Sequence, residues 1–228
     1  MAKFILIETS TALCSCAVWA DGKVAAIRED AGRSHSANTA LFIQEMLSGL
    51  GLSVKDCDAV CLGMGPGSYT GLRVGSSTAK GLCLGAGIPL IAVSSLDVLV
   101  QEAIETGAAE GFGAIVPMAD ARRMEVYTAV YSPAGERLGD ITAAVITPDS
   151  FAGELSAGRV LFTGEGAPKC ASVITSLNAS FRSALPSTRY MGALAEREFA
   201  AGNFRDTAYF EPLYLKDFIA TTSKKHLW

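Results

Sequence analysis

The segment Gly65-Pro66-Gly67-Ser68-Tyr69-Thr70-Gly71-Leu72-Arg73-Val74-Gly75 is the most informative part of the chain. It follows an apolar, strand-like run at 59–64 and precedes a helix-like run that continues to about Gly85. Glycine tolerates tight turns and lets the backbone approach another group closely. The segment therefore predicts a tight loop between a strand and a helix, with another group held close to its backbone.

The loop does not match the two common nucleotide-binding motifs. It is not a Walker A loop, because Leu72 follows Gly71 where that motif has lysine. It is not the GxGxxG motif either, because Thr70 stands where the third glycine should be. Two interpretations stay open. The amides of the helix N-terminus could bind phosphate, or the small residues Gly71, Gly75 and Ala79 could form a stripe for close packing or for a partner.

Composition restricts the class of protein. The chain has 228 residues, is 50% hydrophobic and carries a net charge of −4, which is typical of a folded chain with one sizeable core or two small lobes. An acidic chain lacks the basic face that binds a nucleic-acid backbone tightly, so nucleic acid is expected only through a partner. The apolar run 4–7 is too short for a signal peptide, and no window has 18 uninterrupted apolar residues. We therefore expect a cytoplasmic protein without membrane contact.

Hydrophobic periodicity predicts alternating strands and helices. Strands are expected at 3–9, 13–20, 23–28, 59–64, 88–93, 114–120, 125–131, 137–146 and 159–163. Helices are expected at 34–50, 70–85, 95–105 and 191–201, from 148 onward, and after 166 to about 177. An extended tail is expected at 209–218.

The order strand-strand-strand-helix-strand-helix is expected twice. Glu8 corresponds to Asp120 at an offset of 112 residues, and Gly65-x-Gly67 corresponds to Gly164-x-Gly166 at an offset of 99. Such a duplication predicts an α/β fold of two similar lobes with a cleft between them. The glycine-rich segment 107–113 is the expected boundary, which gives an N-terminal lobe at 1–107 and a C-terminal lobe with an extended tail at 108–228.

Two segments could carry cleft chemistry. The run Glu8-Thr9-Ser10-Thr11 places an acid and three hydroxyls where two-lobed phosphotransferases of the actin, sugar-kinase and Hsp70 superfamily have an acidic residue, usually Asp, and hydroxyls. The same run could equally be a polar turn that satisfies its own backbone. Asp120 could act as a base or hold a metal-bound water in a kinase, or it could form an ion pair with Arg122 or Arg123.

Histidine and cysteine patterns argue against other catalysts. The only histidines, His35 and His226, form no HxxxH or HExxH pair, and the chain has no GxSxG motif. No CxxC pair or zinc-finger spacing occurs among the six cysteines. We expect buried, reduced thiols at Cys14, Cys16, Cys57, Cys61, Cys83 and Cys170.

The glycine-rich segment resembles the signature of the TsaB family, also called YeaZ, which comprises bacterial proteins of tRNA threonylcarbamoyladenosine biosynthesis. Three further runs support the resemblance: Ile7–Thr11, Asp120–Arg123 and Pro212–Lys216, although the family commonly has Arg at the last of these positions. The resemblance covers most of the chain. It implies an actin-like ATPase (ASKHA) fold.

The resemblance also implies a non-catalytic role. In the related TsaD, which transfers the threonylcarbamoyl group to adenosine 37 of tRNAs that decode ANN codons, an HxxxH pair binds metal. That pair falls here on Ser95 and Leu99; leucine cannot ligate a metal, and neutral serine is a poor ligand. The resemblance therefore implies no metal and no cofactor, and it implies that the M22 glycoprotease name follows the fold rather than a working site.

The implied partners are TsaD as heterodimer, TsaE as third member, and a homodimer when the chain is alone; tRNA is reached only through the complex. The implied partner surface comprises His35, Leu41, Phe42, Glu45, Met46, Gly71, Arg73, Gly75 and Ala79. A vestigial nucleotide cleft would comprise Glu8, Thr9, Ser10, Thr11, Gly65, Gly67, Ser68 and Asp120. An ATP-dependent small-molecule kinase of the same superfamily and, more weakly, an M22-type glycoprotease remain the alternatives.

Overall fold

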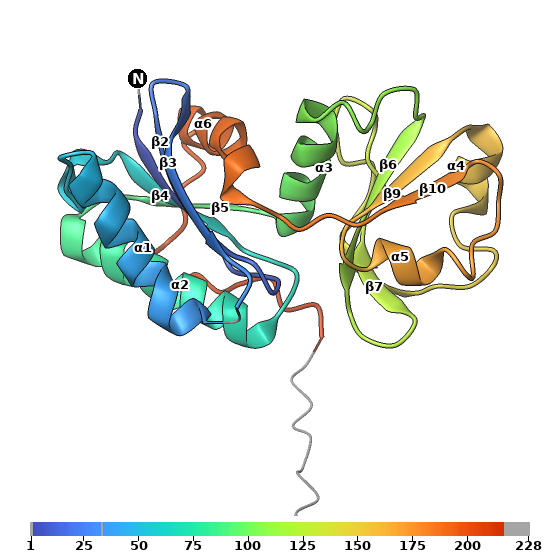
Figure 1. The fold of residues 1–228 in the computed structure, drawn as a ribbon, viewed down its shortest axis with the longest axis horizontal. Coiled ribbons are helices and arrows are strands. Elements are labelled where there is room, and N and C mark those ends of the chain that lie inside the picture. Colours follow the sequence, from blue (N-terminus) through green and yellow to red (C-terminus); the bar gives the residue numbers. More distant parts are fainter. Residues whose placement is uncertain (1, 33, 217–228) are drawn as a thin grey trace, which may run out of the picture.

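A computed structural model describes residues 2–32 and 34–216, which form two sheets of five strands each (Figure 1). The first sheet has the order β3-β2-β1-β4-β5. Its β1 pairs antiparallel with β2 and parallel with β4. The strand bounds are β1 Phe4–Glu8, β2 Cys14–Ala20, β3 Lys23–Asp30, β4 Ala59–Gly63 and β5 Leu90–Val93.

The second sheet repeats this arrangement. Its order is β10-β9-β6-β7-β8, with β6 antiparallel to β7 and parallel to β9. Its strands are β6 Ala114–Asp120, β7 Glu125–Thr128, β8 Thr142–Val145, β9 Val160–Thr163 and β10 Ala179–Arg182. In both sheets the first strand lies at the centre between an antiparallel second strand and a parallel fourth strand. The predicted fold of two similar α/β lobes is confirmed.

Helices cover both faces of the first sheet. The alternation of side chains along β1 sends Ile5 and Ile7 toward α1 and α2, and Phe4 and Leu6 toward α6. In Figure 1 α1 and α2 lie side by side on one face. The helix bounds are α1 His35–Gly49, α2 Tyr69–Ala86, α3 Ser95–Glu105, α4 Ala152–Ala157, α5 Ala167–Cys170 and α6 Gly192–Ala200, with 3-10 turns at η1 Val54–Asp56 and η2 Thr188–Tyr190.

Two helices pack on the sheet of the other half of the sequence. Leu194 of α6 lies in one cluster with Phe4 of β1, although α6 follows the second sheet in the chain. Conversely, Val100 of α3 lies in one cluster with Ile115 of β6. The division at residue 107 stays a prediction, and these two helices cross it in space (Figure 1).

Several elements of the second half differ from the sequence prediction. The strand predicted at 125–131 ends at Thr128, and the helix predicted from 148 begins at Ala152. The helix after 166 has four residues only, and Leu177, its predicted end, is fully exposed. The strand predicted at 137–146 is reduced to Thr142–Val145. Strand β10 was not predicted, because all four of its residues are half-buried and show no clear alternation. The predicted tail 209–218 extends two positions beyond the described residues.

Candidate functional site

The glycine loop after β4 is held by hydrogen bonds to other parts of the chain. The Ser68 amide donates to the Ser10 carbonyl oxygen at 2.6 Å, and the Ser95 amide donates to the Gly65 carbonyl oxygen at 2.8 Å. Ser68 also caps α2, because its hydroxyl accepts from the Gly71 amide at 3.3 Å. Two amides that a bound phosphate could contact, those of Ser68 and Gly71, are thus already used within the protein.

The stripe of small residues on α2 faces the interior of the first lobe. A Cβ atom at Gly71 would overlap the Thr9 carbonyl oxygen, and an added Cβ at Gly75 would overlap the Thr9 hydroxyl. Thr9 completes this close contact by donating from its hydroxyl to the Gly71 carbonyl oxygen at 2.9 Å. Ala79 and Met46 are also buried. These contacts place Met46, Gly71, Gly75 and Ala79 inside their own lobe, which does not favour their assignment to a partner surface, and that assignment stays a prediction.

Glu8 ends β1 with a carboxylate that is fully buried. Its Oε1 accepts from the Ser10 amide at 2.7 Å and its Oε2 accepts from the Ser95 hydroxyl at 2.8 Å. Gly63 leaves room for the carboxylate, since a Cβ atom there would overlap it. Burial raises the pKa of Glu8, and the hydrogen bonds from Ser10 and Ser95 oppose this rise. Glu8 is therefore a structural acid in a closed network and does not face an open site.

Asp120, the counterpart of Glu8, is exposed at the end of β6. It forms an ion pair with Lys169 of α5, and its Oδ1 accepts from the Arg122 amide at 2.9 Å. Lys169 also donates to the Glu125 carbonyl oxygen at 2.7 Å. Asp120 therefore forms an ion pair, as one of the two interpretations expected, but its partner is Lys169 and not Arg122 or Arg123.

Acidic side chains of the two lobes come near one another. Burial raises the pKa of Glu165, and the nearby Asp120 and Glu8 raise it further. Beside them, the buried hydroxyls of Ser10 and Thr163 have no hydrogen-bond partner among the described residues. None of the predicted nucleotide-cleft residues lines either of two cavities of about 460 and 310 Å³ found elsewhere on the molecule. A vestigial nucleotide cleft therefore stays a prediction.

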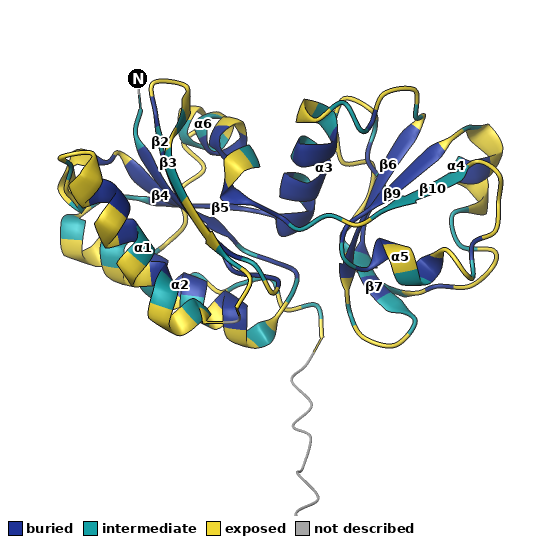
Figure 2. Ribbon diagram, in the orientation of Figure 1, coloured by how far each residue is buried: buried dark blue, intermediate teal, exposed yellow. Residues whose placement is uncertain are grey.

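The solvent side of α1 and α2 carries several large apolar side chains. Leu41 is 47% exposed on α1, and Leu84 is 71% exposed on α2. Near the start of α2, the Arg73 guanidinium lies over the Tyr69 ring at 4.2 Å. Figure 2 shows that exposed residues follow the outer side of both helices. We call this surface the outer α1–α2 face and define it by Leu41, Phe42, Glu45, Leu50, Arg73 and Leu84.

Comparison with known proteins gives consistent matches. A family model described as "TsaD: tRNA N6-adenosine threonylcarbamoyltransferase" matches residues 27–220. The tRNA threonylcarbamoyladenosine biosynthesis protein TsaB of Haemophilus influenzae is 32% identical over 93% of both chains. TsaB of Escherichia coli is 33% identical over 96% of both chains. The chain belongs to the TsaB family.

A solved structure of a TsaB family protein has the same fold. YeaZ from Pseudomonas aeruginosa superimposes with a TM-score of 0.81 at 27% identity, covering 94% of this chain and 100% of that one. A second Pseudomonas aeruginosa structure, described as similar to peptidase YeaZ, gives 0.83 at 25% identity, covering 95% and 100%. The predicted family and fold are both confirmed.

The other positions that the sequence singled out in this TsaB family chain are His35, the pair Ser95 and Leu99, and the cysteines. His35 begins α1 and is half-buried, with its Nε2 at 2.9 Å from the Thr11 carbonyl oxygen. Ser95 and Leu99, the positions of the substituted histidine pair, are both buried. No group of three His, Cys, Asp or Glu residues that could hold a metal ion occurs in the described part of the chain. All six cysteines are buried and free, as predicted.

Sequence reasoning missed Leu50 and Leu84 on the outer α1–α2 face. The signal for Leu84 was present, because it continues the exposed helical series of Arg73, Ser77 and Gly81 opposite the buried stripe. Across the described residues, no helix is long and apolar enough to cross a membrane. The cytoplasmic location stays a prediction.

Proposed function

We propose that this chain is a non-catalytic accessory subunit in the formation of threonylcarbamoyladenosine at position 37 of ANN-decoding tRNAs. Membership of the TsaB family supports the pathway. The closed network of Glu8, Ser10 and Ser95 supports the non-catalytic role, because the acid that a kinase would direct at phosphate is fully buried and hydrogen-bonded. This network also makes the small-molecule kinase alternative less favoured.

The proposed partner is a TsaD-type paralogue, bound through the outer α1–α2 face. Exposed apolar side chains flanked by charged ones are typical of protein interfaces. Leu41 and Leu84 would supply the apolar contact, with Glu45 and Arg73 at its edge. TsaE would be the third member, and the same face would form the homodimer in the absence of TsaD. The acidic net charge favours contact with tRNA through the complex.

A reconstitution assay tests this proposal. The chain is mixed with TsaD and TsaE of the same organism, tRNA and threonylcarbamoyl-adenylate, and the modified nucleoside is measured. We expect TsaD to require the chain, and we expect the chain alone to turn over neither ATP nor the adenylate. Modification by TsaD without the chain, or phosphorylation of a metabolite by the chain alone, would contradict the proposal.

Two matched variants test the surface. Leu84→Glu places a charge on the outer α1–α2 face, and we expect it to abolish copurification with TsaD. Leu177→Glu makes the same change at an exposed leucine of the second lobe, and we expect copurification to persist. Circular dichroism checks that both variants are folded. If both variants copurify with TsaD to the same extent, the partner does not bind through the outer α1–α2 face.

A further inference from the structure

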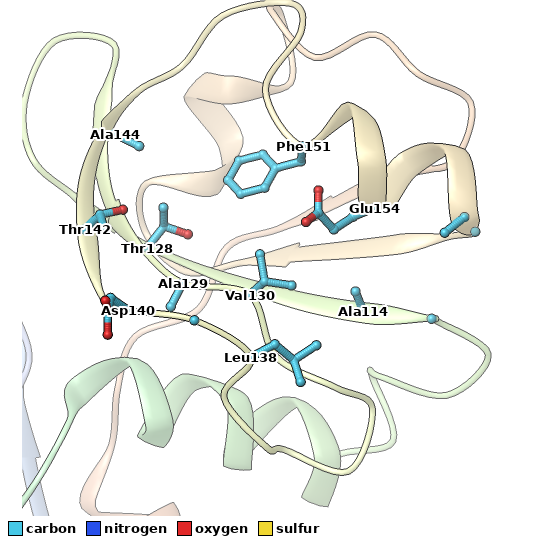
Figure 3. A pocket seen from close by; sticks show the side chains of 14 residues that line it. Ala114, Thr128, Ala129, Val130, Leu138, Asp140, Thr142, Ala144, Phe151 and Glu154 are labelled. Atoms are coloured by element: carbon cyan, nitrogen blue, oxygen red, sulfur yellow. The ribbon is translucent and has the colours of Figure 1, made fainter.

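The second lobe contains a cavity of about 460 Å³ between the β7–β8 pair and α4 (Figure 3). It exists because small residues leave space between the sheet and the helix. The walls are completed by the larger side chains of Val130, Leu138 and Phe151. Its volume lies in the range of small-molecule sites. The small residues are Gly113, Ala114, Ala129, Gly139, Ala144, Ala157 and Gly158.

One buried hydroxyl in the cavity wall lacks a partner. Thr128 is only 3% exposed, and its Oγ1 has no hydrogen bond among the described residues. Figure 3 shows this hydroxyl directed to the side of the cavity on which Glu154 lies. A polar group removed from water without a hydrogen bond is destabilising, so native structures usually supply a partner. A ligand in this cavity would supply the partner.

The charged groups of the cavity are all acidic. Glu154 is half-buried, and its carboxylate has neither a hydrogen bond nor an ion pair within residues 2–32 and 34–216. Asp140 lines the side away from Glu154 in Figure 3. No lysine or arginine is among the lining residues. The cavity therefore selects against anionic ligands and for cationic ones.

Backbone strain occurs at the same place. Phe151 precedes α4 with a φ of 60°, the left-handed region that side-chain-bearing residues rarely adopt. Its ring contacts the ring of Phe162, with centroids 5.4 Å apart, and forms one wall of the cavity. Strain of this kind concentrates at ligand sites, where the surrounding structure maintains it.

We propose that this cavity binds a linear alkyl diamine. One ammonium group donates to the Glu154 carboxylate and to the Thr128 hydroxyl. The methylene chain lies against Val130, Leu138 and Phe151, and the second ammonium group faces Asp140. A single neutral or anionic molecule of the same size would leave the carboxylates unpaired.

Titration calorimetry on the full chain tests the proposal, with 1,4-diaminobutane as the probe and 1,4-butanediol as its neutral match. We expect saturable binding of the diamine at a stoichiometry of one, and no binding of the diol. Absence of diamine binding, or equal binding of the diol, would overturn the proposal.

Three variants locate the site. Glu154→Gln should weaken diamine binding about tenfold or more, since the ammonium group loses its charged partner and keeps only a neutral acceptor. Thr128→Val keeps the shape and removes the hydroxyl, and it should weaken binding about threefold to tenfold without loss of stability. Glu110→Gln, an exposed acid outside the cavity, is the control for net charge and should leave binding unchanged. Equal affinity of the Glu154 and Glu110 variants would refute this site.

Discussion

At the scale of single residues, Glu8 is fully buried and its hydrogen-bond partners are neutral groups, the Ser10 amide and the Ser95 hydroxyl. Burial disfavours the charged carboxylate, and its pKa is raised above the ordinary value of 4.5. The folded state therefore retains the proton of Glu8 to higher pH than the unfolded state does. The stability that this group contributes is complete below its ordinary pKa and is lost as pH rises through the raised pKa.

We accordingly predict that Glu8→Gln stabilises the protein progressively as pH increases. Glutamine can accept from the Ser10 amide and carries no charge, so the penalty of the buried carboxylate is removed. Urea unfolding of both proteins between about pH 5 and pH 8 measures the difference. A difference in the free energy of unfolding that stays constant with pH would contradict the buried-acid interpretation. The variant Glu165→Gln shows how much of the pH dependence comes from Glu165, the neighbouring acid.

Gly75 provides a second prediction at this scale. A Cβ atom there would overlap the Thr9 hydroxyl and lie 3.1 Å from Leu62 Cδ1, whereas Gly81 on the same helix has open space around it. We expect Gly75→Ala to lower the free energy of unfolding by about 1–3 kcal/mol. Gly81→Ala should raise it by about 0.5–1 kcal/mol through helix propensity. Urea unfolding followed by circular dichroism measures both, and equal effects would contradict the close approach of α2 to Thr9.

At the scale of elements, the strands with continuous apolar runs could be predicted from sequence, because both sides of such strands are buried. Strands β1, β4 and β6 are examples, with burial at nearly every position. Strand β10 could not be predicted, since its half-buried residues 179–182 gain their order from parallel pairing with β9. The packing of α6 on the first sheet was also missed, because periodicity predicts a buried helix face without showing which sheet covers it.

The same limit applies to the candidate site. Local sequence patterns drew attention to Glu8 and the glycine loop, and the structure places them together through the Ser10 and Gly65 hydrogen bonds. Sequence could not show that the small stripe of α2 faces inward, because a stripe of small residues suits a partner helix and an adjacent turn equally well. The cavity at Thr128 and Glu154 was missed, since its two sides lie on β7 and α4 and carry no local motif.

An ion pair between β10 and α3 leads to a further prediction. Arg182 of β10 donates to both carboxylate oxygens of Glu102 on α3, whose side chain is 9% exposed. We expect Arg182→Met to lower the free energy of unfolding by roughly 2–4 kcal/mol, because it leaves a nearly buried carboxylate unpaired. The double variant Arg182→Met/Glu102→Gln should recover part of this loss. Chemical denaturation of the two proteins decides the matter, and no recovery in the double variant would exclude an unpaired charge as the cause.

At the scale of the whole molecule, residues 213–216 contact both lobes and so connect them through side-chain and backbone interactions. The Leu213 amide donates to the Met64 carbonyl oxygen of the first lobe at 2.8 Å, and the Tyr214 ring lies 5.1 Å from the Tyr69 ring. Lys216 then pairs with Glu125 of the second lobe and lies near the Tyr127 ring. The segment thus acts as a strap between the glycine-loop helix and β7.

The two ends of this strap should differ in strength. The Lys216–Glu125 pair is partly exposed, and exposed ion pairs contribute about 0–1 kcal/mol and weaken with salt. An aromatic pair contributes about 0.5–1.5 kcal/mol and is insensitive to salt. We therefore predict that Tyr214→Ala costs about 1 kcal/mol at any ionic strength, and that Lys216→Met costs less and loses its effect in high salt. Urea unfolding at low and high salt measures both costs.

Hydrogen exchange at 125–128 should rise in both variants, because each detaches the strap from one lobe. Unchanged exchange in both variants would show that β7 is held without the strap.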